Sequence, residues 1–441
     1  MNVIEINRQL AMGATDGEGL LPHLEDLKSA AYVFRLDFGL GVLPEEPGIV
    51  IIRGPRQYGK STWLEGQLVQ TVRTFGPGTA FYLNGDGIAN AQSLAEAIRD
   101  LVPLYAADAR VRRLFVDEIT AVKDWQRALK TLVDSGELRK VLIITTGSKA
   151  ADLRHGGERL PGRKGRLGRT TYLFTPVSYR EFRRVCGDAL GADTLHAYLL
   201  SGGSPIACAQ IARGRLPEYV VETVKDWVYG ECAYSWRHRS SLLAVVEAMI
   251  RHGGTPLGQA KLARDAGLAN NTVAMGYVSL LSDLMCVASS FAWDPSRNVK
   301  IRRKPCKYHF SNTLAALAWH PAVIRTVEDF ERLPAQSRGM WYEWAVAQEL
   351  WRRAAIRGEE FPEEMAHWQG DQHEIDFVLA PHRFLEVKAG KTSPLEFAWF
   401  SRSFPRGELI IVNQARYKTQ NLTAITLEDF LLGENEGTRS N

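Results

Sequence analysis

Short apolar runs alternate with stretches of helical periodicity over the first part of the chain. The runs are rich in Val, Ile and Phe, which is typical of buried strands, whereas residues 122–138 repeat apolar side chains at helical spacing. Strands that alternate with helices predict an α/β fold with a parallel sheet. A further helix is expected at Leu24–Phe38, and strands are expected at 48–53, 79–84, 112–117, 140–146 and 170–175.

The middle of the chain has a mostly helical pattern. Residues 179–235 show it with one interruption at Ser201–Pro205. Three amphipathic segments follow, with a tight turn at Gly267 between the second and the third, and this spacing is that of a helix-turn-helix. Two apolar runs joined by a Pro-Ser-Arg-Asn turn then predict a β-hairpin wing. The helices are expected at 242–250, 257–266 and 273–284, and the hairpin strands at 287–293 and 299–303.

A glycine-rich motif joins the first expected strand to a helix. It reads Gly54-Pro-Arg-Gln-Tyr-Gly59-Lys60-Ser61, the G-x-x-x-x-G-K-[ST] pattern of a phosphate-binding loop. Glycines let backbone N–H groups wrap phosphates, Lys60 reaches the β- and γ-phosphates, and the Ser61 hydroxyl ligates Mg²⁺. The flanking strand and helix make a chance glycine loop the weaker alternative. ATP-binding residues are therefore expected at Gly54, Pro55, Arg56, Gln57, Tyr58, Gly59, Lys60, Ser61 and Thr62.

Two acids end the third expected strand. A nucleoside triphosphatase needs one acid for the Mg²⁺ shell and one to orient the attacking water. Asp117 fits the first role and Glu118 the second, although a solvated acidic strand end is the alternative. The next strand ends in Thr146-Gly-Ser148, where either hydroxyl can sense the γ-phosphate, or simply form a turn.

A Gly-rich basic segment follows at 154–169. It suits contacts with nucleic-acid phosphates, or it could supply an arginine to the γ-phosphate of a neighbouring subunit; a solvated loop is the alternative. The expected wing also runs into a basic stretch, Lys300–Lys307. A basic wing suits DNA phosphates, while winged helices also serve as protein-binding modules and lids.

A second chemical pattern lies near the C-terminus. His373–Leu379 and Phe384–Lys388 are expected to pair as a hairpin that brings Asp376 beside Glu386 and Lys388. Two carboxylates can hold Mg²⁺ or Mn²⁺, which activates water and neutralises a scissile phosphate, and Lys388 can stabilise the developing charge. Glu343, on an expected helix, is a further acid. The alternative is a salt-bridged, solvent-facing hairpin.

Composition and charge narrow the classes of protein and the cellular location that we expect. The chain has 441 residues, 45% of them apolar, and a net charge of only +4, so that local basic clusters matter more than the total charge. Its five cysteines lack a C-x-x-C spacing, which argues against a zinc site and favours reduced thiols. No signal peptide or membrane-spanning run is evident, and we expect a cytoplasmic protein.

Together the motifs resemble a bacterial and archaeal family of AAA-type P-loop ATPases with a C-terminal PD-(D/E)XK nuclease-like domain. The resemblance covers most of the chain. It departs at Ser61, where threonine is commoner, and at Phe310-Ser-Asn312, where the family usually has an aspartate. The matching segments are the loop at 54–60, Leu114–Glu118, Trp125–Lys130, Thr146–Ser148, Leu160–Arg163, Pro176–Phe182, Gly202–Pro205, Glu343, Glu374–Val378 and Glu386–Lys388.

The resemblance implies an ATPase with a helix-turn-helix and a nuclease-like domain, and Arg163 in a role that depends on assembly into a homo-oligomer. We expect a Mg²⁺-dependent ATPase that acts on DNA, with phosphodiester cleavage at the C-terminal site. The alternatives are a DNA-gripping switch with an inactive nuclease fold, and a nucleotide switch whose partners are proteins. The expected parts are an N-terminal extension (1–47), the ATPase domain (48–178), a helical connector (179–239), a winged helix (240–335), a nuclease-like domain (336–432) and a polar tail (433–441).

Overall fold

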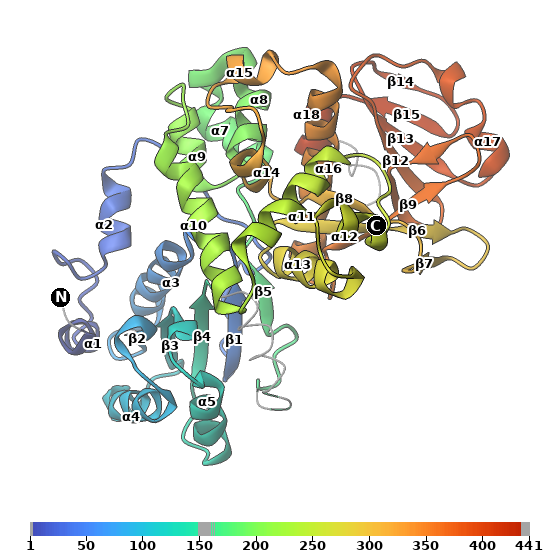
Figure 1. Ribbon diagram of the computed structural model, residues 1–441. Coiled ribbons are helices and arrows are strands. Elements are labelled where there is room, and N and C mark those ends of the chain that lie inside the picture. Colours follow the sequence, from blue (N-terminus) through green and yellow to red (C-terminus); the bar gives the residue numbers. More distant parts are fainter. Residues whose placement is uncertain (1–2, 149–159, 161, 163, 434–441) are drawn as a thin grey trace. The chain divides into compact units, whose positions relative to one another are not determined.

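A computed structural model describes residues 3–148, 160, 162 and 164–433 (Figure 1). The chain divides into two compact units. The first contains Met1–Thr175 and Ala355–Gly358, and the second contains Pro176–Ala354 and Glu359–Asn441. Among the described residues, no helix is both long and apolar enough to cross a membrane.

The first unit is built on a parallel sheet with strand order β2-β3-β4-β1-β5. The predicted α/β fold with a parallel sheet is thereby confirmed. Strand β4 lies between the strand that precedes the glycine-rich loop and the strand that ends in the two acids. The strands are β1 (Gly48–Arg53), β2 (Ala80–Asn84), β3 (Arg113–Asp117), β4 (Leu142–Gly147) and β5 (Thr171–Leu173).

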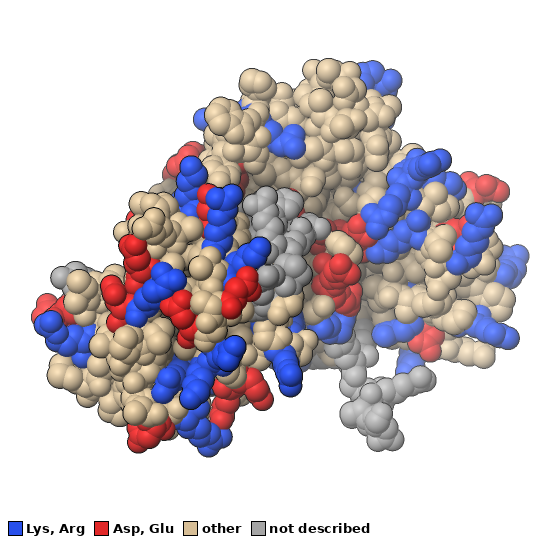
Figure 2. All heavy atoms as spheres, turned by 90° about the horizontal axis from the view of Figure 1, so that it is seen from below, with Lys and Arg blue, Asp and Glu red and all other residues tan. Residues whose placement is uncertain are grey.

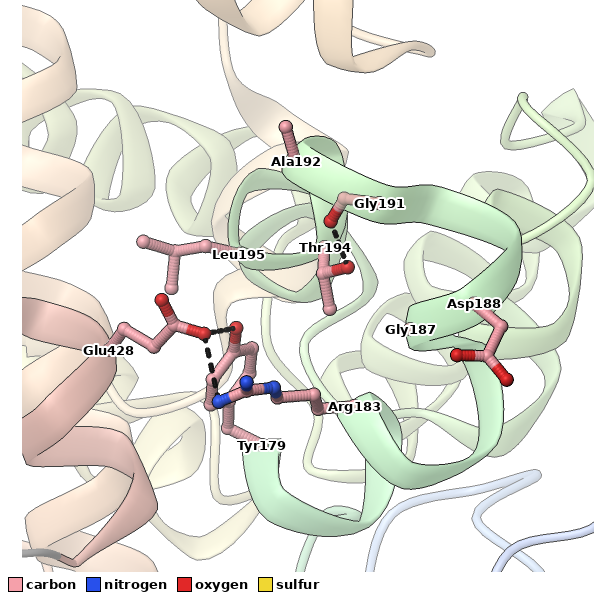
Figure 3. A pocket seen from close by; sticks show the side chains of 9 residues that line it. All are labelled: Tyr179, Arg183, Gly187, Asp188, Gly191, Ala192, Thr194, Leu195 and Glu428. Atoms are coloured by element: carbon pink, nitrogen blue, oxygen red, sulfur yellow. Dashed lines mark hydrogen bonds and ion pairs between the residues drawn. The ribbon is translucent and has the colours of Figure 1, made fainter.

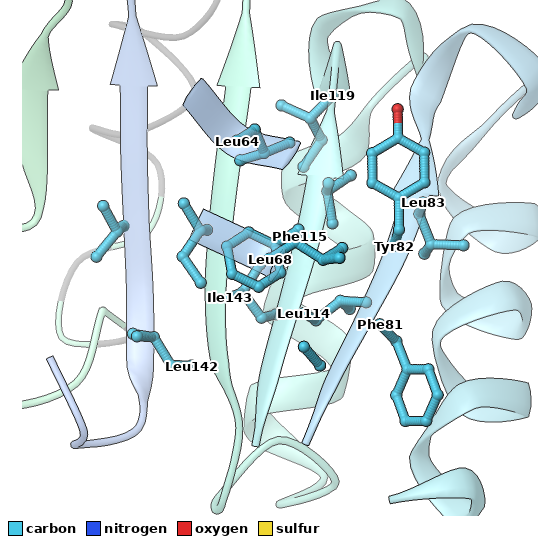
Figure 4. Close-up of a cluster of buried hydrophobic side chains, with 14 of the residues drawn as sticks. Leu64, Leu68, Phe81, Tyr82, Leu83, Leu114, Phe115, Ile119, Leu142 and Ile143 are labelled. Carbon is cyan, nitrogen blue, oxygen red and sulfur yellow. The ribbon is translucent and has the colours of Figure 1, made fainter. Parts of the chain in front are cut away.

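The apolar strands are buried on both faces, which explains why their sequences are continuous rather than alternating. Helix α3 packs against β2, β3 and β4. Figure 4 shows Leu64 and Leu68 of this helix beside Phe115 and Ile143 of the sheet. The helices of this unit are α1 (Val3–Ala11), α2 (Pro22–Lys28), α3 (Lys60–Phe75), α4 (Ala91–Leu101) and α5 (Trp125–Asp134).

The helix expected at Leu24–Phe38 is only partly present, and this prediction was wrong beyond Lys28. Helix α2 ends there, and the chain continues without regular structure. Phe38 is buried in the core, with ring centroids 5.0 Å from Trp63 and 4.7 Å from Phe174. The local pattern favoured a helix here, but the segment instead places Phe38 in the core of the first unit.

The described part of the second unit begins with four helices, and three more follow where the helix-turn-helix was expected. The first four are α7 (Tyr179–Leu190), α8 (Thr194–Ser201), α9 (Pro205–Ile211) and α10 (Glu218–Tyr234). The next three are α11 (Arg239–Arg251), α12 (Gln259–Asp265) and α13 (Asn271–Asp283). The later helices are α14 (Thr313–Trp319), α15 (Val327–Glu331), α16 (Ala335–Arg357), α17 (Phe400–Ser403) and α18 (Leu427–Leu432).

Two sheets complete this unit. In one, β6 pairs with β7, β8 and β9, and β9 pairs with β10; this sheet takes strands from both sides of the domain boundary expected after residue 335. The other has the order β11-β12-β13-β15-β14. The first contains β6 (Val287–Asp294), β7 (Val299–Ile301), β8 (Lys307–Phe310), β9 (Glu364–Gln369) and β10 (Glu374–Ile375). The second contains β11 (Phe377–Ala380), β12 (Arg383–Val387), β13 (Glu408–Val412), β14 (Tyr417–Lys418) and β15 (Leu422–Ile425).

The strand expected at His373–Leu379 is split in the structure. Its first half, β10, pairs with β9, and its second half, β11, pairs antiparallel with β12. Asp376 lies at the break, where the chain passes from one sheet to the other. The expected hairpin therefore forms, but over fewer residues than the alternation indicated.

Candidate nucleotide site and a buried acidic cluster

The glycine-rich loop joins β1 to α3 at the carboxyl edge of the parallel sheet. Gly59 has a φ of 93°, a left-handed conformation that favours glycine. A Cβ atom on Gly54 would lie 2.5 Å from the Cβ of Phe174, so this position also requires glycine. The loop therefore packs tightly against Phe174, which directly follows β5. The first N–H groups of α3, which have no partner within the helix, are the groups that can bind a phosphate.

Lys60 is buried within this loop. Its ammonium donates to the carbonyl oxygens of Gly54, at 3.0 Å, and Pro55, at 2.7 Å. Burial lowers the pKa of Lys60 to about 8, partly offset by Glu118 and Asp117. An ammonium whose hydrogen-bond acceptors are neutral carbonyl groups is a natural partner for a phosphate anion, which adds negative charge at hydrogen-bond distance.

The two acids are fixed by the end of β4. The Thr146 hydroxyl donates to the buried Asp117 carboxylate, which also accepts the N–H of Glu118 at 3.1 Å. Ser148 donates its N–H and its hydroxyl to Glu118 Oε2, both at 3.1 Å. Each expected polar group at the tip of β4 thus positions one acid. Thr146 positions Asp117, the proposed metal ligand, and Ser148 positions Glu118, the proposed water-orienting group.

Arg56 and Arg163 were also expected at this site. Arg56 approaches Ser148, with its Nε 3.4 Å from the hydroxyl oxygen. Arg163 lies outside the described residues. In the basic segment, Arg169 stacks on the Tyr172 ring at 4.2 Å and donates to the Thr171 carbonyl, so it serves the fold rather than a phosphate.

The second unit brings the expected C-terminal residues together. Glu343 comes from α16, Asp376 from the break between β10 and β11, and Glu386 from β12. Both Glu343 and Glu386 are buried, and Lys388 Nζ lies 2.5 Å from Glu386 Oε1. The alternative of a solvent-facing salt-bridged hairpin does not describe this cluster, because its three acids lie inside the protein.

A residue that the sequence analysis placed elsewhere lies at the centre of this cluster. Lys307 of β8 is fully buried, and its Nζ donates to Asp376 Oδ1 at 2.8 Å. The same nitrogen lies 3.9 Å from Glu343 Oε1 and 3.7 Å from Glu374 Oε2. We refer to Lys307, Glu343, Glu374, Asp376, Glu386 and Lys388 as the acidic cluster.

The expected basic wing is therefore partly wrong. Lys307 cannot reach DNA from the interior. Lys300 donates to the Glu364 carbonyl, and Arg302 pairs with both carboxylate oxygens of Glu364, at 2.5 and 2.6 Å. Arg303 and Lys304 remain exposed. Charge counting along the sequence missed the contacts of Lys300 and Arg302 because their partner Glu364 belongs to β9, far along the chain.

The carboxylate oxygens of the two expected metal ligands are already engaged. Asp376 Oδ1 accepts from Lys307 and Oδ2 from the N–H of Val387. Glu386 Oε1 pairs with Lys388, and Oε2 accepts the N–H of Asp376. Consistently, no three His, Cys, Asp or Glu side chains in the described ranges form a group able to hold a metal ion. The C-terminal site in this arrangement does not fit a divalent cation.

Burial sets the protonation of the cluster. Burial, and then the Asp376 carboxylate, raises the pKa of Glu343 and of Glu386 to about 8. Burial alone would raise the pKa of Asp376, but Lys307 outweighs it and holds this pKa below its usual value. Asp376, paired with Lys307, is therefore the buried acid of the cluster whose ionised form is favoured.

His309 gives this region a pH dependence that can be measured. It is fully buried, and burial, with the Lys307 charge, lowers its pKa to about 3. Below pH 6.5 the unfolded chain takes up a proton that the folded chain refuses, so stability falls at a limiting slope of about 1.4 kcal/mol per pH unit. We expect His309→Phe to stabilise the protein at pH 5 but not at pH 8, in thermal unfolding followed across this range. The same replacement at the exposed His382 is the control for the change of side chain.

A pocket of about 330 Å³ lies apart from these residues in the second unit (Figure 3). The Glu428 carboxylate accepts the Tyr179 hydroxyl at 2.8 Å and pairs with Arg183 at 3.3 Å. Tyr179, Arg183 and Glu428 thus satisfy one another, Asp188 lines the pocket as a further acid, and none of the expected site residues lines it.

Sheet order, glycine-rich loop and paired acids define the first unit as a P-loop nucleotide-binding domain. In agreement, residues 46–183 match the family model described as an AAA domain. No curated protein sequence matches the chain.

Several solved structures resemble the chain at low identity. The Walker-type ATPase PABY2304 of Pyrococcus abyssi is 13% identical, with 69% of this chain and 96% of that chain covered and a TM-score of 0.41. The ORC2 protein of Aeropyrum pernix is 15% identical, with 71% and 91% covered and a TM-score of 0.39. The ORC1 protein of the same organism, in complex with DNA, is 16% identical, with 71% and 90% covered and a TM-score of 0.30. These scores are too low to transfer a function to this chain.

Proposed function

We propose that this protein is a Mg²⁺-dependent ATPase that acts on DNA. The observation that carries the ATPase is the network at one sheet edge, in which β4 holds Asp117 through Thr146 and Glu118 through Ser148, beside the strand that leads to Lys60. Acids so fixed match the demands of hydrolysis more closely than those of passive binding.

Each residue has a distinct role in this proposal. Lys60 and the N–H groups of the loop bind the phosphates, and Glu118 orients the attacking water. Mg²⁺, when bound with ATP, would be held by Ser61 and Asp117 and would neutralise charge on the phosphates. Arg163 is proposed to reach the nucleotide of a neighbouring copy if the protein assembles.

Phosphate release from ATP, measured with the full chain, tests the proposed ATPase activity. We expect turnover in Mg²⁺ that stops on chelation by EDTA, and that is unchanged in Lys140→Ala, an exposed lysine before β4. Absence of turnover with and without DNA would contradict the ATPase.

We propose that α11–α13 and the β6–β7 hairpin act as a winged helix on DNA. Helix α13 itself carries no Lys or Arg, whereas Lys261 and Arg264 of α12, and Arg303 and Lys304 after the hairpin, are exposed. Figure 2 shows basic side chains in small groups among acidic ones on one face of the molecule. Phosphate contact by such groups would be local rather than a property of the whole surface.

Salt dependence distinguishes this DNA role from a partnership with proteins. Phosphate contacts release counterions, so DNA affinity should fall steeply with salt concentration. Joint replacement of Arg303 and Lys304 by alanine should weaken binding and lower the salt slope by about 2, measured by fluorescence anisotropy. Lys140→Ala serves as the charge-matched control. Affinity that is indifferent to salt would favour the switch whose partners are proteins.

Phosphodiester cleavage at the C-terminal site is the second candidate, favoured by the convergence of Glu343, Asp376, Glu386 and Lys388 in a nuclease-like arrangement. The engaged carboxylates favour its rival, in which this fold only grips DNA. Labelled single-stranded, duplex, forked and supercoiled DNAs, in Mg²⁺ or Mn²⁺ and with or without ATP, separate the two. Cleavage that disappears in Glu386→Ala would establish the nuclease, and its dependence on Lys60 would show whether ATP gates it.

A further inference from the structure

Lys307 lies at the centre of the acidic cluster. Its ammonium faces oxygens of three acids from three elements, α16, β10 and the β10–β11 break, at 2.8 to 3.9 Å. Convergence of carboxylate oxygens from separate elements is the donor set that Mg²⁺ and Ca²⁺ use in proteins. Here a lysine on a neighbouring strand supplies the positive charge.

Buried polar atoms without hydrogen bonds lie in the acidic cluster and directly beside it. Glu343 Oε1 has none, and neither ring nitrogen of the fully buried His309 has one, although His309 Nδ1 lies 3.5 Å from this oxygen. Buried polar atoms without partners are rare, and they mark places where a bound group can be missing. They lie on the Glu343 side of the cluster, where the Lys307 ammonium is 3.9 Å away rather than at hydrogen-bond distance.

We propose that Lys307 is the resident cation of this cluster, that it excludes divalent metal ions, and that its removal exposes a binding site for them made by Asp376, Glu343 and Glu374. Lys307 has no solvent exposure, so it is not a surface charge that salt can screen. Asp376 Oδ1 lies 2.8 Å from its ammonium, and oxygens of Glu374 and Glu343 lie at 3.7 and 3.9 Å, so that the positive charge is balanced inside the protein. This proposal concerns cation binding and does not require that the site cut DNA.

Mn²⁺ binding to the full-length, nucleotide-free protein tests it, with free Mn²⁺ followed by electron paramagnetic resonance. We expect Lys307→Met to gain one Mn²⁺ site at least tenfold tighter than any in the wild type, and to gain thermal stability on addition of Mn²⁺. Lys304→Met, an exposed lysine three residues earlier, should behave as the wild type does. The ATP site is unchanged in all three proteins, so its contribution cancels.

A second variant keeps the test valid if Lys307→Met does not fold without metal. Lys307→Gln removes the charge but retains an N–H donor for Asp376, and it should gain the same Mn²⁺ site. Absence of a new site in the folded variants would overturn the proposal, because Lys307 would then be only a structural ion-pair partner. Mn²⁺ bound by the wild type and lost in Glu386→Ala would also overturn it, whatever the outcome of the cleavage assay.

Discussion

Replacing Glu118 by glutamine should leave ATP binding intact and slow hydrolysis by about 10²- to 10⁴-fold, the range that one positioned proton-transfer group contributes. The glutamine amide keeps the size of the side chain and can still accept from Ser148, whose two donors hold Glu118 Oε2 at 3.1 Å. It cannot draw a proton from the attacking water. Single-turnover phosphate release and nucleotide affinity, measured on the same preparation, check both halves of this expectation.

Lys60→Ala provides the comparison, because this variant should lose affinity for ATP as well as turnover. The contrast separates the group that binds phosphate from the group that orients water. Equal loss of nucleotide affinity in both variants would show that Glu118 supports the loop rather than the reaction. Full turnover in Glu118→Gln would assign the water-orienting role to another residue.

Asp376→Ala should lower the free energy of unfolding by about 3–5 kcal/mol, the usual effect of removing one partner of a buried ion pair. The cause is Lys307, whose ammonium would be left in the interior without its closest acceptor, now 2.8 Å away. The N–H of Val387 would also lose the acceptor that it has at 2.9 Å. Urea unfolding followed by tryptophan fluorescence suits this measurement, since Trp341 and Trp344 are buried in the same unit.

Glu374→Ala is the matched control. Its side chain is 42% exposed and lies 3.7 Å from Lys307, so its removal should change stability by about 1 kcal/mol or less. A similar loss in both variants would mean that the total negative charge, rather than the buried pair, maintains the site.

The sequence predicted the first unit well because its information is local. Continuous Val and Ile runs predicted strands that are buried on both faces, and the spacing of Gly54, Gly59 and Lys60 predicted the loop. The pairing of β4 with both β1 and β3 was not predicted, since strand order depends on how the helices cross the sheet. It is this order that brings Thr146 to Asp117.

Less of the acidic cluster could be predicted from the sequence. The alternation of apolar and polar residues predicted that Asp376, Glu386 and Lys388 lie together. It also predicted a single strand at 373–379, whereas the chain changes sheet at Asp376. Lys307 was missed because it ends a basic run, and a basic run normally indicates a solvated surface. A signal was present in Tyr308 and Phe310 beside it, which mark β8 as a buried strand, although no local pattern shows which acid a buried lysine will meet.

Strand β6 links the hairpin to the acidic cluster by a path only a few residues long. Its last residues pair with β7, whereas Ser290, four residues before its end, pairs with Lys307 of β8. The hairpin and the buried lysine are thus connected through one strand, because β6 pairs with β7 at its end and with Lys307 of β8 at Ser290. We therefore expect a ligand that displaces the hairpin to affect the position of Lys307 as well, because β6 pairs with both β7 and β8.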